Sequence, residues 1–371
     1  MNSSKAIISR ISLADLTCAM SNTRGLRSLS EEIKIVQEGW AKVGSVVVCQ
    51  VMAVGAHEKV ESWTGRYIRL QAGDLIMGVI GNRYSTISMY GGVPPEGIQL
   101  PREEPVDLLS AGGLIGECIS YPSYRGSPTK LLILGLASSK GELLEIHPHI
   151  MARHLDISCP LILIAGTSAN VGKTKFAAKL THYLSRTRRK QVAATKLAGA
   201  GNYDDILNLH EAGAKDFLDF VDAGLVSTYG YEGETVVSVA KGILNRLAGK
   251  QPEVIIAELG GDIVGANIPA ILADSEIREA TSAIILVPSD IMAAEGALHH
   301  LKDFGSKVYI SQPIKNPATS QVRAYDIIGR RLYNCEEMKD LEDLVEDILP
   351  QSNISYRSLR TEKSAQSLSS F

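Results

Sequence analysis

Residues 162–180 read ILIAGTSANVGKTKFAAKL. The apolar run Pro160–Ala165 is typical of a buried parallel strand. A loop of small residues follows, and the Gly-Lys-Thr of residues 172–174 opens a segment with helical spacing that extends to about Arg188. A strand, a glycine-bearing loop and a Gly-Lys-Thr at the start of a helix form the context that a phosphate-binding loop requires. This stretch therefore predicts an α/β domain that binds phosphate.

The predicted loop carries the groups that bind a nucleotide. Its backbone N–H groups can converge on a β-phosphate at the positive end of the helix. Lys173 is expected to contact the β- and γ-phosphates, and the Thr174 hydroxyl is expected to bind Mg²⁺. The spacing departs from GxxxxGK[ST], because the first glycine lies one position earlier. The predicted nucleotide-binding residues are Gly166, Thr167, Ser168, Ala169, Asn170, Val171, Gly172, Lys173, Thr174 and Lys175.

Short apolar runs and helix-length segments alternate after this loop. Further strands are expected at Gln191–Thr195, Glu253–Ala257, Ala283–Val287 and Lys307–Ser311. Segments of helical length are Tyr203–Phe220, Thr235–Ala248 and Met292–Asp303, and a closing acidic helix is expected at Glu336–Ile348. This alternation predicts an α/β fold with a doubly wound, mostly parallel sheet over residues 155–350.

Residues 1–150 predict a separate, strand-rich α/β domain that covers the phosphate site or recognises the substrate. Ser30–Trp40 is expected to form a helix, because a serine N-cap and early acidic residues precede apolar spacing. Strands are expected at Ser45–Val54, Gly65–Leu70, Asp74–Ile80, Gly113–Ser120 and Lys130–Leu136. The Ser-rich, polar residues 351–371 are expected to form a disordered tail.

The composition excludes several classes of function. With 371 residues, of which 45% are apolar, the chain is long enough for two domains with their own cores. A net charge of -3 gives no field that attracts nucleic acid or an anionic membrane. There is no apolar run long enough to span a membrane, and five cysteines without CxxC spacing favour a reducing compartment. We expect a cytoplasmic protein with a small-molecule substrate.

Residues 166–174, GTSANVGKT, resemble the GT-x-x-x-VGKT loop of dethiobiotin synthetase and its relatives, including the cobyrinic acid amidotransferase synthetases. A second lysine follows the next strand in these families, and Lys196 occupies that position, followed by leucine where the family has proline. Residues 254–262, VIIAELGGD, are similar to the family's E-G-x-G-G stretch. The resemblance covers about residues 160–312. It implies an enzyme that uses ATP and Mg²⁺ to activate or phosphorylate a small carboxylate, carbamate or amine-derived substrate. It also implies that a homodimer is possible.

The catalytic candidates are Lys173, Lys196 and Glu258. The resemblance implies that Lys196 contacts the substrate carbamate and the transferred phosphate, and a cation there would stabilise developing negative charge. Glu258 ends a predicted central strand, where it could bind Mg²⁺ opposite Thr174. Of the acidic residues that follow the Lys196 strand, Asp222 is the one that we predict as a further metal ligand. The full sequence has no NKxD motif for guanine, which favours ATP over GTP.

Two other classes of function remain open. The order of an N-terminal domain and a GT-x-x-x-VGK domain also resembles the D-amino-acid N-acetyltransferase family, as do residues 219–224, DFVDAG. In that case the loop would bind the pyrophosphate of coenzyme A, and the enzyme would acylate an amino acid. The third class is a GTP-dependent switch or metallochaperone. In the N-terminal half, Arg66, Arg83, Tyr84 and Arg125 are either anion contacts or ordinary surface residues.

Overall fold

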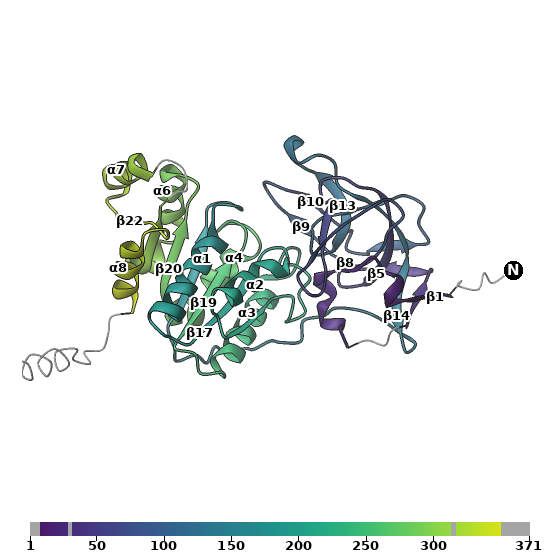
Figure 1. Cartoon of the computed structure of the whole chain (residues 1–371), viewed down its shortest axis with the longest axis horizontal. Coiled ribbons are helices and arrows are strands. Elements are labelled where there is room, and N and C mark those ends of the chain that lie inside the picture. Colours follow the sequence, from purple (N-terminus) through teal and green to yellow (C-terminus); the bar gives the residue numbers. More distant parts are fainter. Residues whose placement is uncertain (1–7, 29–31, 313–316, 350–371) are drawn as a thin grey trace, which may run out of the picture.

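The computed structural model describes residues 8–28, 32–312 and 317–349. We call residues 8–146 the N-terminal region and residues 161–349 the C-terminal region. The two regions lie side by side along the long axis of the molecule (Figure 1). The predicted tail, residues 351–371, lies outside the described residues. None of the helices in the described ranges is long and apolar enough to cross a membrane.

The C-terminal region contains a seven-stranded parallel sheet with the order β18-β17-β19-β16-β20-β21-β22. The strands are β16 (Leu161–Gly166), β17 (Val192–Ala198), β18 (Asp216–Asp219), β19 (Val254–Leu259), β20 (Thr281–Val287), β21 (Val308–Ser311) and β22 (Leu332–Tyr333). The prediction of a parallel sheet is confirmed. Since β16 lies between β19 and β20, the phosphate loop leaves the middle of the sheet, at its carboxyl edge.

Helices cover both faces of this sheet (Figure 1). One face packs against α1 (Lys173–His182), α2 (Tyr203–Glu211) and α8 (Met338–Ile348). The other packs against α3 (Gly233–Ala248), α4 (Ile268–Ala273), α5 (Ser275–Ala280), α6 (Ile291–His300) and α7 (Pro317–Ile328). A π-helical turn, Tyr183–Thr187, extends α1. The sheet is therefore doubly wound, as predicted.

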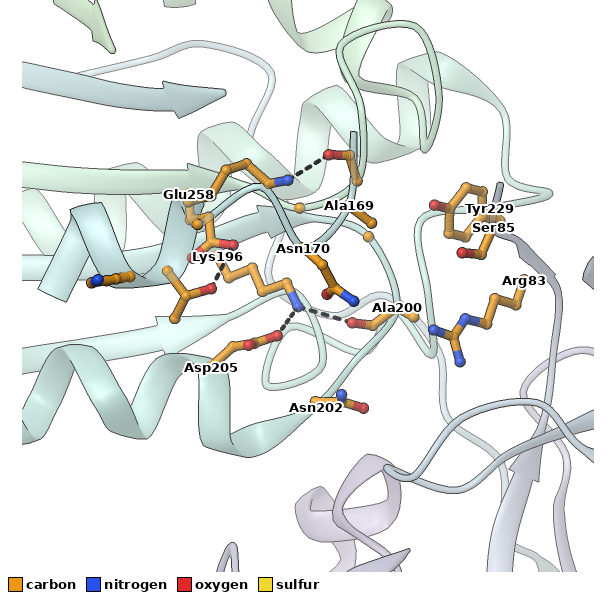
Figure 2. Close-up of a pocket in the computed structure, with 17 residues that line it drawn as sticks. Arg83, Ser85, Ala169, Asn170, Lys196, Ala200, Asn202, Asp205, Tyr229 and Glu258 are labelled. Carbon is orange, nitrogen blue, oxygen red and sulfur yellow. Dashed lines mark hydrogen bonds and ion pairs between the residues drawn. The ribbon is translucent and has the colours of Figure 1, made fainter. Parts of the chain in front are cut away.

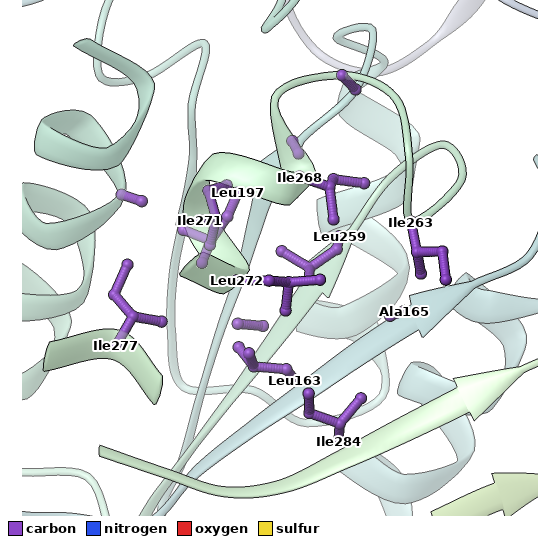
Figure 3. Close-up of a cluster of buried hydrophobic side chains, with 14 of the residues drawn as sticks. Leu163, Ala165, Leu197, Leu259, Ile263, Ile268, Ile271, Leu272, Ile277 and Ile284 are labelled. Carbon is purple, nitrogen blue, oxygen red and sulfur yellow. The ribbon is translucent and has the colours of Figure 1, made fainter. Parts of the chain in front are cut away.

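Alternation along β16 explains how one strand serves both faces. Leu161, Leu163 and Ala165 join the cluster on the α3 and α4 side, part of which Figure 3 shows. Ile162 and Ile164 join the cluster on the α1 side. Each of these side chains is fully buried, and burial of one aliphatic side chain of valine size or larger stabilises a fold by about 1.5–3 kcal/mol. A strand that is apolar at every position is therefore held at the centre of the sheet.

The predicted helical segment Tyr203–Phe220 is wrong in its second half. Helix α2 ends at Glu211, and Gly213, with φ +117°, turns the chain. Glycine adopts this left-handed conformation without a steric penalty. The chain then enters β18, which pairs with β17 at the edge of the sheet. The segment was long enough for one helix, but the glycine divides it into a helix and a strand.

The N-terminal region is built around a mixed sheet with the main path β1-β3-β14-β5-β8-β13-β10-β9. The strands of the region are β1 (Ile8–Ser12), β2 (Cys18–Ala19), β3 (Glu32–Val36), β4 (Gly39–Ala41), β5 (Val46–Ala53), β6 (Lys59–Glu61), β7 (Tyr67–Arg69), β8 (Leu75–Ile80), β9 (Arg83–Tyr84), β10 (Tyr90–Gly92), β11 (Ile98–Leu100), β12 (Val106–Leu108), β13 (Leu114–Ser120), β14 (Lys130–Ser139) and β15 (Glu142–Leu143). Of these, β4 pairs with β11 and β6 pairs with β7 in two small separate sheets. Short 3₁₀ turns link some of the strands, of which Ser21–Leu26 contacts the C-terminal region. The five strands predicted here are confirmed, with shifted ends.

The helix predicted at Ser30–Trp40 is wrong over Glu32–Trp40, since β3 and the start of β4 lie there; Ser30 and Glu31 lie outside the described residues. In β3, Ile33 and Ile35 are buried, whereas the alternating residues Glu32 and Lys34 are not. This alternation has a period of two, which is typical of a strand with one buried face. β3 pairs with β1 on one side and β14 on the other. Pairing on both edges and the buried isoleucines outweigh the acidic residues that suggested a helix N-terminus.

Polar contacts fix the N-terminal region against helix α2 and strand β18. Arg24 forms ion pairs with Asp219 and with Asp222, the latter at 2.7 Å. The carboxylate of Glu61 accepts hydrogen bonds from the backbone N–H groups of Tyr203 and Asp204, both at 2.6 Å, at the start of α2. Glu61 is fully buried. It therefore acts as an N-terminal cap that comes from the other region of the chain.

Candidate functional site

The loop between β16 and α1 has the backbone of a phosphate-binding loop. Asn170 and Gly172 have positive φ values, +60° and +104°, which turn the loop back over the end of the strand. A Cβ on Gly166 would come within 2.9 Å of Val171 Cγ2 and of the Lys173 side chain. Glycine at this position therefore lets Lys173 lie close to the end of β16. Successive N–H groups in such a loop make a concave site for an anion.

Lys173 is buried, with 5% of its surface exposed. Its Nζ donates hydrogen bonds to the backbone carbonyls of Ser168, at 2.8 Å, and Gly261, at 2.6 Å. Burial lowers the pKa of Lys173, and the nearby Lys196 cation lowers it further, while Glu258 opposes both effects. Two carbonyls hold the ammonium in place without neutralising its charge, which leaves it able to bind a phosphate oxygen.

Glu258 lies beside the start of α1. The Thr174 hydroxyl donates to its Oε1 at 3.1 Å. Its Oε2 is buried and has no hydrogen-bond partner among the described residues. Burial raises the pKa of Glu258, as does the Asp205 carboxylate, whereas Lys196 and Lys173 oppose the rise. Burial of a carboxylate oxygen without a hydrogen-bond donor costs free energy of folding, unless a bound ligand interacts with that oxygen.

Lys196 lies at the end of β17, also with 5% of its surface exposed. Its Nζ contacts the carboxylate of Asp205 and donates to the carbonyl of Ala200 at 3.0 Å (Figure 2). Burial alone would lower the pKa of Lys196, but the carboxylates of Asp205 and Glu258 outweigh this effect and raise it. Asp205 and Ala200 therefore hold Lys196 in place near the carboxyl edge of the sheet, and the neighbouring carboxylates favour its charged form.

These side chains line one cavity of about 420 Å³ between the two regions of the chain. The lining residues are Arg83, Ser85, Ala169, Asn170, Gly172, Lys173, Thr174, Lys175, Lys196, Gly199, Ala200, Asn202, Asp205, Tyr229, Glu258, Gly260 and Gly261. Only Arg83 and Ser85 in this set come from the N-terminal region. We call this space the main cavity. Its volume is in the range of small-molecule sites.

The structure places most of the predicted site residues at this cavity. Lys173, Lys196, Glu258 and Thr174 line it, as do other residues of the loop. Asp222 does not, since its carboxylate contacts Arg24 and accepts from the backbone N–H of Asp219 at 2.9 Å. Of the remaining loop residues, Gly166, Thr167, Ser168 and Val171 shape the loop without lining the main cavity.

Nine residues that line the main cavity were not among the predicted site residues, and they include Ser85, Asp205 and Tyr229. Asp205 lies beside Lys196, whereas the predicted Asp222 pairs with Arg24. It is the third residue of α2, so that its side chain lies at the end of the helix that faces the sheet edge. Its position nine residues after Lys196, at the start of a helix, was the available signal. Ser85 and Tyr229 reach the cavity only through tertiary folding.

A smaller cavity of about 160 Å³ lies on the other side of the loop. It is lined by Val171, Gly172, Lys175, Phe176, Val287, Ser311, Gln312, Asn334, Cys335 and Glu336. Glu336 forms ion pairs with Lys175, at 2.6 Å, and Lys179, at 3.0 Å. We call this space the side cavity. It combines an apolar wall with the amide groups of Gln312 and Asn334, which can both donate and accept hydrogen bonds.

The sheet topology and the loop together define the C-terminal region as a P-loop nucleotide-binding domain. The loop follows a central parallel strand, and its Gly-Lys-Thr opens the next helix at the carboxyl edge of the sheet, where ligands of open α/β sheets bind.

No protein-family model and no curated protein matches the chain. Among solved structures, it is similar to the signal recognition particle receptor FtsY from Elizabethkingia anophelis, with 16% identity and a TM-score of 0.37 over 51% of this chain and 63% of that one. It is also similar to a ParA family ATPase from Chlorobium tepidum, with 16% identity and a TM-score of 0.33 over 53% and 95% of the two chains. A DUF1611 family protein from Anabaena variabilis gives 11% identity and a TM-score of 0.36 over 54% and 62%. The chain thus spans less than two thirds of the receptor and of the DUF1611 protein. The resemblance to dethiobiotin synthetase stays a prediction.

Proposed function

We propose that this protein is an ATP- and Mg²⁺-dependent enzyme of the ligase or phosphotransferase type, which activates or phosphorylates a small carboxylate, carbamate or amine-derived substrate. The observation that carries this proposal is the pairing of Thr174 and Glu258 at the start of α1. A hydroxyl lies 3.1 Å from a carboxylate whose second oxygen is buried without a partner in the described structure.

The donor set fits Mg²⁺. A hydroxyl and a carboxylate are hard oxygen ligands, and magnesium is usually bound by one or two protein ligands together with waters and phosphate oxygens. The described residues contain no cluster of three or more His, Cys, Asp or Glu that could hold a metal ion, so a dedicated all-protein cage is not the arrangement here. Thr174 and Glu258 would hold the ion, which when bound neutralises charge on the phosphates.

The lysines of the main cavity suit phosphoryl transfer. Lys173 would bind the β- and γ-phosphates together with the N–H groups of the loop. Lys196 would lie near the transferred group, where a fixed cation stabilises negative charge that develops in the transition state. Because Asp205 holds Lys196 in place, its ammonium needs no rearrangement during the reaction. Positioned charges of this kind supply much of the catalysis in phosphoryl transfer.

The side cavity is the proposed site of the adenine base. It adjoins the loop at Gly172 and Lys175, on the side away from the main cavity. Phe176 and Val287 supply apolar surface, and the amides of Gln312 and Asn334 can read the edge of a base. The sequence has no NKxD motif for guanine. ATP is therefore the nucleotide that we propose.

Calorimetric titration of ATP, GTP and acetyl-CoA, with and without Mg²⁺, tests this function. We expect Mg²⁺-dependent binding of ATP that Lys173→Ala weakens about 10- to 100-fold, as the loss of a charged hydrogen bond does. Glu258→Gln should remove the effect of Mg²⁺ while some ATP binding remains. The exposed Lys250→Ala is the matched control and should bind like wild type.

A screen of small carboxylates and amines for stimulated ADP release then tests the reaction. Substrate-dependent ADP release that Lys196→Met abolishes would support the proposal. Binding of acetyl-CoA without binding of ATP would instead favour the acyltransferase, and a preference for GTP would favour a nucleotide switch. Full ATP binding in Lys173→Ala would contradict the proposal, because the loop would then not be the nucleotide site.

A further inference from the structure

Arg83 is a cation of the main cavity that the phosphate chemistry does not use. It belongs to β9 of the N-terminal region, and its side chain extends into the cavity from the side opposite Glu258 (Figure 2). One N–H group of the guanidinium donates to the carbonyl of Leu109. Burial lowers the pKa of Arg83 to about 10; Tyr229 opposes this, and the nearby Arg125 adds to it. Its charge is thus only partly compensated.

The cations of the cavity differ in their partners. Of the four that line it, Lys175 forms an ion pair with Glu336 and Lys196 forms one with Asp205. Neither Lys173 nor Arg83 has a carboxylate within ion-pair distance in the part of the chain that the structure describes. Lys173 belongs to the phosphate loop. Arg83 is the corresponding uncompensated cation at the other end of the cavity.

The backbone of Arg83 is held rigidly against the C-terminal region. The carbonyl of the preceding residue, Asn82, accepts from the Ser227 hydroxyl at 2.7 Å. A Cβ on Gly92 or on Gly230 would come within 2.0 Å and 2.2 Å, respectively, of the Asn82 side chain. The Asn82 side chain therefore packs closely against Gly92 of the N-terminal region and Gly230 of the C-terminal region. Arg83 therefore has a fixed position relative to the loop, as a binding residue requires.

Two hydroxyl groups lie on the same side of the cavity as Arg83. Ser85 follows two residues later, and Tyr229 comes from the C-terminal region. The Tyr229 ring contacts Tyr84 with 5.6 Å between centroids, which fixes its orientation. Both hydroxyls can donate to an anion. A planar guanidinium with hydroxyls beside it is suited to a carboxylate, which accepts two parallel hydrogen bonds from arginine.

We propose that Arg83, with Ser85 and Tyr229, forms a subsite for a carboxylate group of the small substrate, whose reacting group lies toward Lys196 and the phosphate loop. This inference rests on the proposed function, in which the phosphate loop binds the nucleotide. It adds that the substrate carries an anionic group apart from the reacting centre.

Calorimetry on the full chain, with Mg²⁺ and a non-hydrolysable ATP analogue, tests the subsite. The probes are mono- and dicarboxylic acids of three to six carbons and the matching amides. We expect at least one acid to bind and its amide to bind about tenfold or more weakly. Arg83→Gln should weaken the acid by a similar factor, and Arg83→Lys by less. The exposed Arg66→Gln is the matched control and should not change it.

The affinity of each variant for the ATP analogue separates the outcomes. Unchanged analogue binding shows that Arg83→Gln is folded, so that a loss of acid binding alone supports the subsite. If Arg83→Gln weakens the analogue and leaves the acid unaffected, Arg83 contacts phosphate; the subsite is then overturned and the proposed function stands. If acids bind through Arg83 but no nucleotide binds, the subsite stands and the proposed function fails. Equal binding of acids and amides, or no binding of any acid, also overturns the subsite.

Discussion

The guanidinium of Arg24 and the carboxylate of Asp219 form an ion pair that joins the 3₁₀ turn Ser21–Leu26 to the edge strand β18. Their side chains are 3% and 0% exposed. Asp222 forms an ion pair with the same guanidinium. The centroid of the Tyr203 ring lies 4.4 Å from Cζ of Arg24. Two distant parts of the sequence are therefore held together by a buried ion pair, with the partly exposed Asp222 beside it.

Arg24→Met is expected to destabilise the protein strongly. Removal of one partner of a buried ion pair leaves the other charge without compensation, which costs about 3–5 kcal/mol. Urea unfolding would measure the free energy of unfolding. Arg66→Met, which replaces an exposed arginine of the same region, should change it by less than about 0.5 kcal/mol. Similar values for the two variants would contradict the structural role of Arg24.

Asp219 should give stability a specific dependence on pH. Burial raises the pKa of its carboxyl from 3.8 to about 6, although Arg24 opposes the rise. Between these values the folded protein retains a proton that the unfolded chain releases, so the contribution of Asp219 to stability falls as the pH rises through this window. Asp219→Asn has no such titration. The free energy of unfolding of wild type minus that of Asp219→Asn should therefore decrease between about pH 4 and pH 6, then level off. A constant or rising difference would show that the folded pKa is not raised.

Gly172→Ala should affect the site more than the fold. Gly172 has φ +104°, where an L-residue is strained by about 1–2 kcal/mol. Its Cβ would also lie in the loop that we propose to bind phosphate, so we expect nucleotide affinity to fall by tenfold or more, about 1.4 kcal/mol. Gly73→Ala is a matched control, since Gly73 has φ +94° and open space around it. The control should show comparable destabilisation and normal nucleotide binding; a loss of binding in both would indicate general unfolding.

Glu61→Gln tests the cap that one region provides for a helix of the other. Oε2 of Glu61 accepts from Tyr203 and Oε1 accepts from Asp204, so glutamine replaces one of these acceptors with an NH2 donor that faces a backbone N–H group, and the helix N-terminus loses its negative partner. The expected loss is about 1–3 kcal/mol in the free energy of unfolding. Glu58→Gln removes an exposed pair with Arg69 and should cost less than about 1 kcal/mol. Equal losses of stability in the two variants would contradict the role of Glu61 as a cap of α2.

The parts of the structure that depend on local pattern could be predicted from the sequence. The loop around Lys173 and the central strand β16 were predictable because their signals lie within a few consecutive residues. Strand β3 was assigned to a helix because the acidic residues near Ser30 suggested an N-terminus, although the spacing of Ile33 and Ile35 has a period of two. Local spacing does not reveal which strands pair, and it is the pairing with β1 and β14 that makes this segment a strand.

The polar wall of the main cavity could not be predicted in the same way. Several acidic residues follow strand β17. Asp205, in the first turn of α2, lies beside Lys196, whereas Asp222, after β18, lies against Arg24. Arg83 is separated from the loop by about eighty residues of sequence, so its approach depends on the docking of two sheets. Sequence separation carries no information about such contacts unless related sequences are compared.

The cap that Glu61 provides has a mechanical consequence. The two N–H groups that it binds belong to the first turn of α2, and the next residue of that turn is Asp205, the partner of Lys196. Any shift of the N-terminal region would pull on this turn and thereby on the lysine. The N-terminal region is thus connected to Lys196 through Glu61, the first turn of α2 and Asp205, and it also forms a wall of the main cavity. The position of the N-terminal region and the position of the Lys196 ammonium are therefore set together.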